Sequence, residues 1–226
     1  MDLMILENNR ELNQNLSIVT AEEKHLEEMV QCHVRAFPGE FMTLLGARFI
    51  KNFYKFYVSS KGGIVFVALE PLDKVVGLVA GGMPELRKQF SYSRAPLNVI
   101  DIVFIAIANN YVRGRFLHHV RIIVKKVFTK LRHRANVLIR DEPPKDPPGT
   151  WSSLLSICTA PDFRGKGIGK ALMEAFHKES AIRGYKTMRL SVKADNDVAI
   201  ALYNKCGWEE ILKLPTGVYF KRSIGK

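Results

Sequence analysis

RGKGIG, residues Arg164 to Gly169, lies between an apolar run, Leu154 to Cys158, and an amphipathic run, Ala171 to Arg183. Alternate glycines leave little side-chain bulk, so neighbouring backbone N–H groups can turn toward one point. A helix that starts on Gly169 would add the positive end of its dipole to that point. The stretch therefore predicts a strand, a phosphate-binding turn and a helix, in that order.

Two familiar phosphate-binding motifs do not fit this turn. A Walker loop needs Ser or Thr after its Gly-Lys pair, but Gly169-Lys170 is followed by Ala171. A Rossmann turn needs Gly-x-Gly-x-x-Gly and an acidic residue at the end of the next strand. Here the spacing is Gly-x-Gly-x-Gly, and the next expected strand, residues 187–192, runs into Lys193. Neither motif accounts for the turn.

Two segments after the turn supply a second and a third motif: LSVKADN, Leu190 to Asn196, and AIALYNKCGW, Ala199 to Trp208. Together with RGKGIGKALM, residues 164–173, they resemble the GCN5-related N-acetyltransferases, the GNAT family, in order and in spacing. The resemblance is strong over residues 153–208 and loose over residues 18–82. It implies an α/β fold with a mixed, mostly antiparallel central sheet flanked by helices.

The length and the composition suit one globular domain. The 226 residues, 47% hydrophobic and 25% charged, can form a core of their own. We expect a flexible polar leader at residues 1–15 and a single domain at residues 16–226. About 65 residues separate the third and fourth expected strands, which departs from the minimal family pattern. We therefore expect an insertion at about residues 84–149.

The expected compartment is the cytoplasm. The N-terminus lacks the basic start and long apolar run of a signal peptide. The three cysteines, Cys32, Cys158 and Cys206, show no paired spacing, which favours free thiols over a disulfide framework or a zinc site. The longest apolar run, residues 99–108, is about half the length that spans a bilayer. No metal is expected.

The insertion carries most of the excess positive charge. The chain has a net charge of +12, and residues 102–140 hold nine Lys/Arg and no Asp/Glu. Apolar residues at helical spacing predict a basic amphipathic helix over residues 109–134. An anionic ligand or the inner membrane surface would suit it, and so would a solvated helix face. Specific nucleic-acid binding is not favoured, because the segment lacks interleaved aromatic side chains.

The remaining elements follow from periodicity and from turn residues. A capping box at Thr20 and Glu23 predicts a helix that stops near Phe37, and a second helix is expected over residues 41–60. The other expected elements are strands at 16–19, 64–69, 75–80 and 187–192, a short helix that begins after Asn196 and ends at Gly207, and a closing hairpin at 208–214 and 218–221.

The resemblance implies acetyl-coenzyme A (acetyl-CoA) as the cosubstrate. Backbone groups of Ile157 and Thr159 would pair with its pantetheine arm, and Asn196 would bond the same arm, although that residue could equally serve as a helix N-cap. The pyrophosphate would lie on the turn. The residues expected there are Arg164, Gly165, Lys166, Gly167, Ile168, Gly169 and Lys170.

Tyr203 follows Asn196 by seven residues, two helical turns, and so shares its helix face. The resemblance implies that the Tyr203 hydroxyl is the general acid that protonates the departing thiolate. A phenol with a pKa of about 10 stays protonated near pH 7 and can donate. The alternative is a core aromatic residue.

The general base is less clear from the sequence. Some family members place a glutamate five residues before the asparagine, but this chain has Ser191 there. Glu40, between the first two expected helices, and Glu85, after the hairpin, are the candidates, and either could be only a solvated carboxylate. We expect His33 on a half-buried helix face rather than in the chemistry.

The sequence thus predicts direct transfer of an acetyl group from acetyl-CoA to a primary amine of a small molecule. The pattern from Phe37 to Phe49 resembles GNAT proteins linked with bacterial surface-polysaccharide pathways, which implies an amino sugar as the acceptor. A nucleotide-linked amino sugar is anionic, so the basic insertion would suit it. A protein or peptide N-acetyltransferase stays open, as does a peripheral membrane or partner-binding protein with weak catalysis. A homodimer through the closing hairpin is also open.

Overall fold

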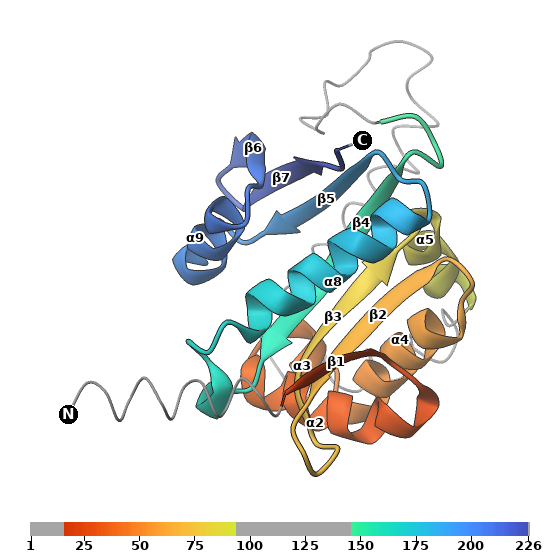
Figure 1. Ribbon diagram of the computed structural model, residues 1–226, viewed down its shortest axis with the longest axis vertical. Helices are drawn as coiled ribbons and strands as arrows, with labels where there is room; N and C mark the ends of the chain where they lie inside the picture. The colour runs from red at the N-terminus through yellow and green to blue at the C-terminus, as the bar shows by residue number, and fades with distance from the viewer. Residues whose placement is uncertain (1–15, 94–145, 226) are drawn as a thin grey trace, which may run out of the picture.

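One sheet organises the protein. The computed structural model describes residues 16–93 and 146–225, and within them seven strands lie in the order β1-β2-β3-β4-β5-β7-β6 (Figure 1). All neighbouring strands are antiparallel except β4 and β5. The strands are β1 Ser17–Thr20, β2 Gly63–Leu69, β3 Val75–Gly82, β4 Trp151–Thr159, β5 Thr187–Val192, β6 Glu209–Leu214 and β7 Gly217–Ser223. The predicted mixed, mostly antiparallel α/β fold is confirmed.

Helices cover both faces of this sheet. Helices α2 and α4 pack on one face and form one apolar cluster with β2, β3 and β4. Helix α8 packs on the other face, in a second cluster that extends to α9 and β7 (Figure 1). The helices are η1 Glu23–His25, α2 Leu26–Ala36, α3 Phe41–Leu44, α4 Ala47–Ser59, α5 Glu85–Ser93, η2 Pro161–Phe163, α8 Ile168–Ile182 and α9 Asp197–Lys205.

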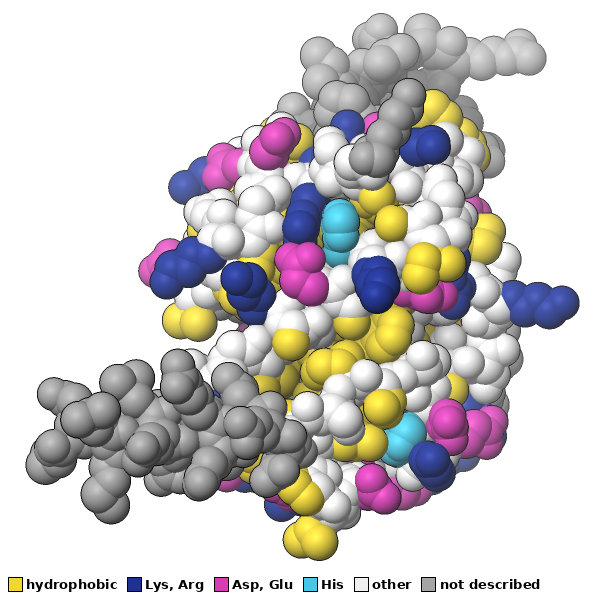
Figure 2. Space-filling view, in the orientation of Figure 1, with side chains coloured by type: hydrophobic (Ala, Val, Ile, Leu, Met, Phe, Trp, Pro, Cys, Tyr) yellow, Lys and Arg dark blue, Asp and Glu magenta, His cyan; other side chains and the backbone are white. Residues whose placement is uncertain are grey.

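The surface on the α8 side mixes acidic and basic side chains. Figure 2 shows no field of one charge on this face, and hydrophobic side chains come to the surface between α8 and β1. No helix among the described residues is long and apolar enough to cross a membrane.

Two helix boundaries differ from the sequence prediction. The predicted capping box at Thr20 is wrong, because Thr20 ends β1; instead the Glu22 N–H donates to His25 Nδ1 at 3.0 Å. The predicted single helix over residues 41–60 is also wrong. Gly46 has φ +88°, a value that favours glycine, and it separates α3 from α4.

The expected insertion falls between the third strand, β3, which ends at Gly82, and the fourth, β4, which begins at Trp151. Its first part forms α5, which the sequence did not predict. The leader at residues 1–15 and the basic helix expected over residues 109–134 lie outside the described residues.

Strand β4 contains a bulge. Ala80 of β3 pairs with Ser156, and the next residue, Gly81, pairs with Leu154, so Leu155 has no partner in β3. One extra residue in a strand reverses which face the following side chains occupy.

The side chains around the bulge show this reversal. Before it, Ser152 Oγ lies 2.9 Å from Ser180 Oγ of α8. After it, Ser156 Oγ lies 3.1 Å from Tyr54 Oη of α4. Ser156 and Cys158 therefore face α2 and α4, although the same alternation without a bulge would have turned them toward α8.

Strands β4 and β5 pair over a short length only. Their parallel pairing joins Trp151–Ser153 to Thr187–Arg189 and then stops. Beyond Ser153 the two strands diverge (Figure 1), and each keeps its antiparallel partner on its other side. The sheet is thus closed at the start of β4 and open at its end.

Asp146 stabilises the end of the sheet at which β4 and β5 pair. Its carboxylate accepts hydrogen bonds from Thr187 Oγ1 and Arg189 Nε, both at 2.8 Å, and Lys221 Nζ lies 3.5 Å away. Burial raises the pKa of this carboxyl, but the bonds from Arg189 and Thr187 lower it more, so the net pKa lies below the usual range. Asp146 thereby ties the chain before β4 to β5 and β7.

We expect Asp146→Ala to lower the free energy of unfolding by about 1–3 kcal/mol, because three donors lose a half-buried acceptor. Urea unfolding at pH 7 measures this. The matched control is Glu209→Ala, an exposed carboxylate on β6, which should change stability by less than about 0.5 kcal/mol. Equal free energies of unfolding of the two variants would show that the Asp146 carboxylate does not stabilise this end of the sheet.

Candidate functional site

The open edge of β4 faces the gap between β4 and β5. The Ala160 N–H donates to the Val76 carbonyl of β3 at 2.8 Å, so the backbone groups of Ala160 point to β3. Backbone direction alternates along a strand, so Thr159 and Ile157 present their N–H and C=O groups to the other side. These are the two residues that the sequence analysis selected.

The glycine turn has the backbone that a phosphate cradle needs. Gly165 and Gly167 have φ +77° and +80°, in the left-handed region that favours glycine. Gly167 is the N-cap, and the helix begins at Ile168, one residue earlier than predicted. No atom lies within 4 Å of where a Cβ would stand on either glycine.

The first turn of α8 has free donors. The first backbone bond into the helix runs from the Ala171 N–H to the Gly167 carbonyl, at 3.0 Å. The N–H groups of Ile168, Gly169 and Lys170 therefore have no acceptor within the helix. With the helix dipole, they favour an anion at this end.

Three elements meet at Gly169. A Cβ on this residue would lie 3.5 Å from Leu202 Cδ2 of α9 and 3.9 Å from Thr159 Oγ1 of β4. The end of β4, the start of α8 and the helix that carries Tyr203 are therefore neighbours. The fold brings the three sequence motifs to one place.

The basic side chains near the turn have different surroundings. Arg164 donates through Nη2 to the Ala36 carbonyl at 3.0 Å and through Nε to the Thr159 carbonyl at 3.4 Å. Its guanidinium thus ties the turn to the end of α2. Lys166 Nζ lies 4.8 Å from the centre of the Phe163 ring, and Lys170 is exposed.

Asn196 and Tyr203 lie on α9. Asn196 caps this helix, because its Oδ1 accepts the Ala199 N–H at 3.1 Å, and the residue is exposed. Tyr203 is 6% exposed, and its ring centre lies 5.6 Å from that of Phe220 and 6.0 Å from that of Trp208. Burial raises the pKa of Tyr203 to about 12, so its hydroxyl stays protonated at neutral pH.

Glu40 lies across the open end of the gap. Both its carboxylate oxygens accept from Lys193 Nζ, at 2.7 and 2.6 Å. Lys193 directly follows β5, and Glu40 follows α2, so the ion pair links the two sides of the opening. Ser191, where a glutamate was sought, is exposed on β5 opposite Tyr219 of β7.

Glu85 lies at the closed end instead. It begins α5, three residues after Gly82, and Gly82 pairs with Ser153 where β4 and β5 are still joined. From Ser153 to Thr159 the strand advances about 20 Å. The structure therefore brings Glu40 close to the opening and keeps Glu85 away from the glycine turn.

The sequence analysis missed a buried polar chain under β4. His33 Nδ1 lies 2.6 Å from Tyr54 Oη, and Tyr54 Oη lies 3.1 Å from Ser156 Oγ. His33 is 3% exposed, not half-buried as predicted, and burial lowers its pKa to about 4. The helical spacing did put His33 on an inward position, but nothing in it linked that residue to Tyr54 or to Ser156.

Acid should destabilise the fold through His33. Its pKa is about 4 when folded and 6.5 when unfolded, so the unfolded chain binds the proton more readily between these values. The contribution is complete above the unfolded pKa and is lost as the pH falls toward the folded one. Between pH 7 and 4.5 we expect it to fall by about 2 kcal/mol.

Urea unfolding of the wild type and of His33→Asn at both pH values isolates this contribution. The wild type should lose more stability than the variant. An equal loss in both proteins would assign the acid sensitivity to other groups.

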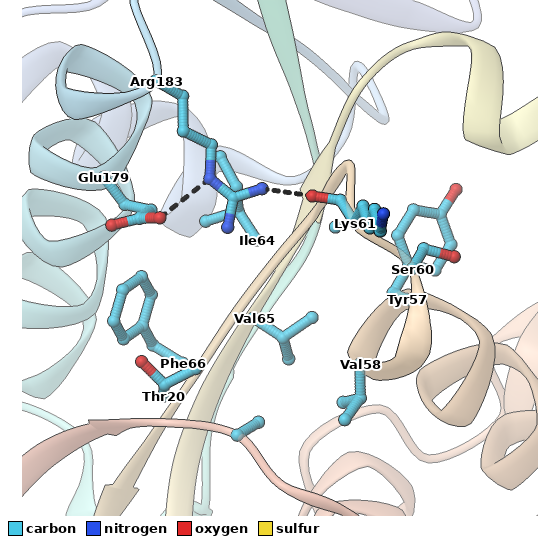
Figure 3. A pocket seen from close by; sticks show the side chains of 12 residues that line it. Thr20, Tyr57, Val58, Ser60, Lys61, Ile64, Val65, Phe66, Glu179 and Arg183 are labelled. Carbon is cyan, nitrogen blue, oxygen red and sulfur yellow. Dashed lines mark hydrogen bonds and ion pairs between the residues drawn. The ribbon is translucent and has the colours of Figure 1, made fainter.

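A pocket of about 210 Å³ lies elsewhere. It is at the first residues of β2, between the C-terminal ends of α4 and α8 (Figure 3). Arg183 spans its rim, with bonds to Glu179 Oε1 and to the Lys61 carbonyl, both at 2.8 Å. Because α8 is about 22 Å long, the pocket is far from the glycine turn, and none of the predicted site residues lines it.

The described residues contain no group of three His, Cys, Asp or Glu side chains that could hold a metal ion. Cys32, Cys158 and Cys206 are free and buried, as the sequence predicted.

Comparison with known proteins finds similarity to acetyltransferases over part of the sequence. The model of the acetyltransferase (GNAT) family matches residues 127–208. The ribosomal protein bS18-alanine N-acetyltransferase of Escherichia coli K12 is 41% identical over 59 residues, which are 26% of this chain and 40% of that protein. The chain thus spans less than half of this relative's length.

Solved structures share the fold over most of the chain. Ard1 from Thermoplasma volcanium superposes with a TM-score of 0.57 at 16% identity, covering 94% of this chain and 99% of its own. The aminoglycoside N-acetyltransferase AAC(6')-Iy, in complex with CoA, gives 0.55 at 13% identity, with 88% and 91% covered. The match of the family model to residues 127–208 and the shared fold agree with the resemblance to the GNAT family that the three motifs carry.

Proposed function

We propose that the protein is an acetyl-CoA-dependent N-acetyltransferase. The observation that carries the proposal is the gap between β4 and β5, which opens onto the glycine turn. One side of it offers strand backbone at Ile157 and Thr159 that does not pair with β5, and the Thr159 carbonyl also accepts from Arg164 Nε at 3.4 Å. Its end offers the free N–H groups of the first turn of α8 and backbone room at Gly165 and Gly167.

These residues fit acetyl-CoA. Ile157 and Thr159 would hold the pantetheine amides as an added strand does. The N–H groups from Gly165 to Lys170 would hold the pyrophosphate. Asn196, whose Oδ1 caps α9, keeps an exposed side-chain NH₂ that can donate to the same arm. The related enzyme AAC(6')-Iy was solved with CoA, which supports this assignment.

The bound cosubstrate supplies an activated acetyl thioester. Tyr203 would donate its proton to the sulfur that departs, and the raised pKa keeps that proton available at every ordinary assay pH. Glu40, at the opening, would receive the ammonium group of the acceptor in place of Lys193. Either Glu40 or water would then take the proton that the amine must lose before attack.

The acceptor we propose is a primary amine of a small molecule, with a nucleotide-linked amino sugar as the first candidate. Two related proteins frame the choice: one is named for an alanine of a ribosomal protein, and the other for aminoglycosides. A peptide N-terminus is therefore the second candidate.

An acceptor panel tests the proposal. Release of free CoA thiol from acetyl-CoA would be followed with glucosamine, a UDP-linked amino sugar, spermidine, kanamycin and an alanine-terminated peptide. Acetyl-CoA binding is measured separately by calorimetry. Tight binding with turnover of one amine supports the enzyme, whereas absence of acetyl-CoA binding rejects it.

A non-catalytic protein on the same scaffold is the alternative, favoured by Ser191 where a glutamate base was sought. In that case acetyl-CoA would bind without turnover of any amine. Sedimentation with vesicles that contain or lack anionic lipid then tests the peripheral membrane form. Equal absence of binding to both vesicles, at low and high salt, removes it.

A further inference from the structure

In the buried chain of hydrogen bonds that joins His33, Tyr54 and Ser156, each contact needs a donor and an acceptor. Its 2.6 Å contact between Tyr54 Oη and His33 Nδ1 is shorter than N–H···O bonds usually are, and within the range of bonds that a hydroxyl donates. In the His33 tautomer that carries its proton on Nε2, Tyr54 donates to Nδ1. Having given its one proton, the Tyr54 oxygen can only accept, so Ser156 donates to it at 3.1 Å. The lone pairs of Ser156 stay free.

The series of hydrogen bonds from His33 through Tyr54 ends at Ser156 of β4. The bulge at Leu155 turns Ser156 onto the α2 and α4 face of the sheet, and the backbone of the next residue, Ile157, faces the gap. The glycine turn and α8 lie on the other face. A second substrate that meets the thioester in the gap must come from the face that the cosubstrate does not occupy. Ser156 lies on that face, directly before Ile157.

His33 shows that the chain costs stability. Its Nε2 is buried without a hydrogen-bond partner among the described residues. Such an orphan typically costs about 1–3 kcal/mol. A phenylalanine and a leucine could fill the places of Tyr54 and His33 without that cost, so a polar chain here needs a reason beyond packing.

We propose that the Ser156 hydroxyl accepts a hydrogen bond from the N–H of the acceptor amine, and that Tyr54 and His33 are positioning residues which aim its lone pair. This rests on the proposed function. When the C–N bond forms and the C–S bond breaks, the sulfur takes its proton from Tyr203. The proton that the amine gives up goes to Glu40 or to water, not along the chain.

The acidity of the groups agrees with an orienting role. His33, with a pKa of about 4, would be a poor acceptor for a proton from an alkylamine, whose pKa is about 10. The titratable groups that face this chain are Tyr54 from α4, Cys158 from β4 and Cys32 from α2, and burial raises the pKa of Tyr54. The hydrogen bond between the two thiols raises the pKa of Cys158 and lowers the pKa of Cys32.

The test uses the full chain and the panel amine that turns over fastest. Ser156→Ala should lower kcat about tenfold, because one hydrogen bond to the amine is lost, and leave the KM for acetyl-CoA within twofold. Ser156→Thr keeps the hydroxyl and should recover most of kcat. A kcat of Ser156→Ala within twofold of the wild type overturns the proposal.

The positioning residues have their own pair of variants. His33→Asn keeps an acceptor near the place of Nδ1 and should preserve kcat, whereas His33→Leu removes it and should lower kcat three- to tenfold. Tyr54→Phe should resemble His33→Leu. A purely structural role predicts a different result, in which the KM for acetyl-CoA and kcat change together in all three variants, and that result also overturns the proposal.

Calorimetry with acetyl-CoA distinguishes a failure of this proposal from a failure of the proposed acetyltransferase function. If the wild type does not bind acetyl-CoA, the proposed function itself is wrong. If every variant binds acetyl-CoA as the wild type does and only kcat responds, in the order given, the orienting chain is supported.

Discussion

Gly167→Val should weaken acetyl-CoA binding at least about 100-fold. Gly167 has φ +80°, which costs an ordinary residue about 1–2 kcal/mol and a β-branched one more. The new side chain would also stand in the open space beside the first turn of α8, where the pyrophosphate is expected. Both effects remove the alignment of backbone donors on which an anion depends. Isothermal calorimetry with acetyl-CoA measures the loss.

The same helix offers a matched control. Gly184, just after α8, has φ +79° and nothing within 4 Å of an added Cβ. Gly184→Val therefore carries the same backbone strain at the other end of the helix. It should lower thermal stability as much as Gly167→Val does and leave the affinity for acetyl-CoA unchanged. Equal affinities of the two variants would show that the turn is not the cradle.

The sequence was informative where function depends on local backbone. The glycines of the turn are readable because only glycine adopts φ near +80° easily, and the Asn196 cap is readable because such caps act within one helical turn. Spacing along one helix also related Asn196 to Tyr203. These local rules predicted the turn, the helix that follows it and the places of the strands along the sequence.

The sequence could not show what depends on distant partners. Tyr54 and Ser156 are 102 residues apart in the chain, and only the register of β3 against β4 brings Ser156 to the correct face. The bulge at Leu155 decides that register, and β4 itself contains no glycine or proline that marks it. Glu40 and Lys193, 153 residues apart in the sequence, likewise meet only in the folded protein.

The sequence also left open where the candidate side chains lie. It offered Glu40 and Glu85 as equals, but the pairing of Gly82 with Ser153 puts only Glu85 at the closed end of the sheet. The sequence placed Arg164 among the cofactor-binding residues, and in the structure its guanidinium bonds the Ala36 carbonyl at 3.0 Å. In both cases the sequence identified the candidate residue, and only the fold showed where its side chain lies.

Tyr203→Phe should lower kcat about 100-fold and change the KM for acetyl-CoA by less than threefold, since a positioned general acid contributes at least that factor. The substitution removes one hydroxyl and keeps the ring that packs on Phe220 and Trp208, so the fold should persist. Because the pKa of Tyr203 is about 12, the wild-type rate should show no loss of this acid below pH 10. Steady-state release of CoA thiol between pH 6 and 10 measures both effects.

Tyr185→Phe is the control for this substitution. Tyr185 is also buried and its pKa is also raised, chiefly by burial, but it precedes β5 at the closed end of the sheet. Its loss should leave kcat within about twofold, because its hydroxyl cannot reach a sulfur at the open end. If the two variants lose kcat equally, Tyr203 is a core aromatic residue and another group donates the proton.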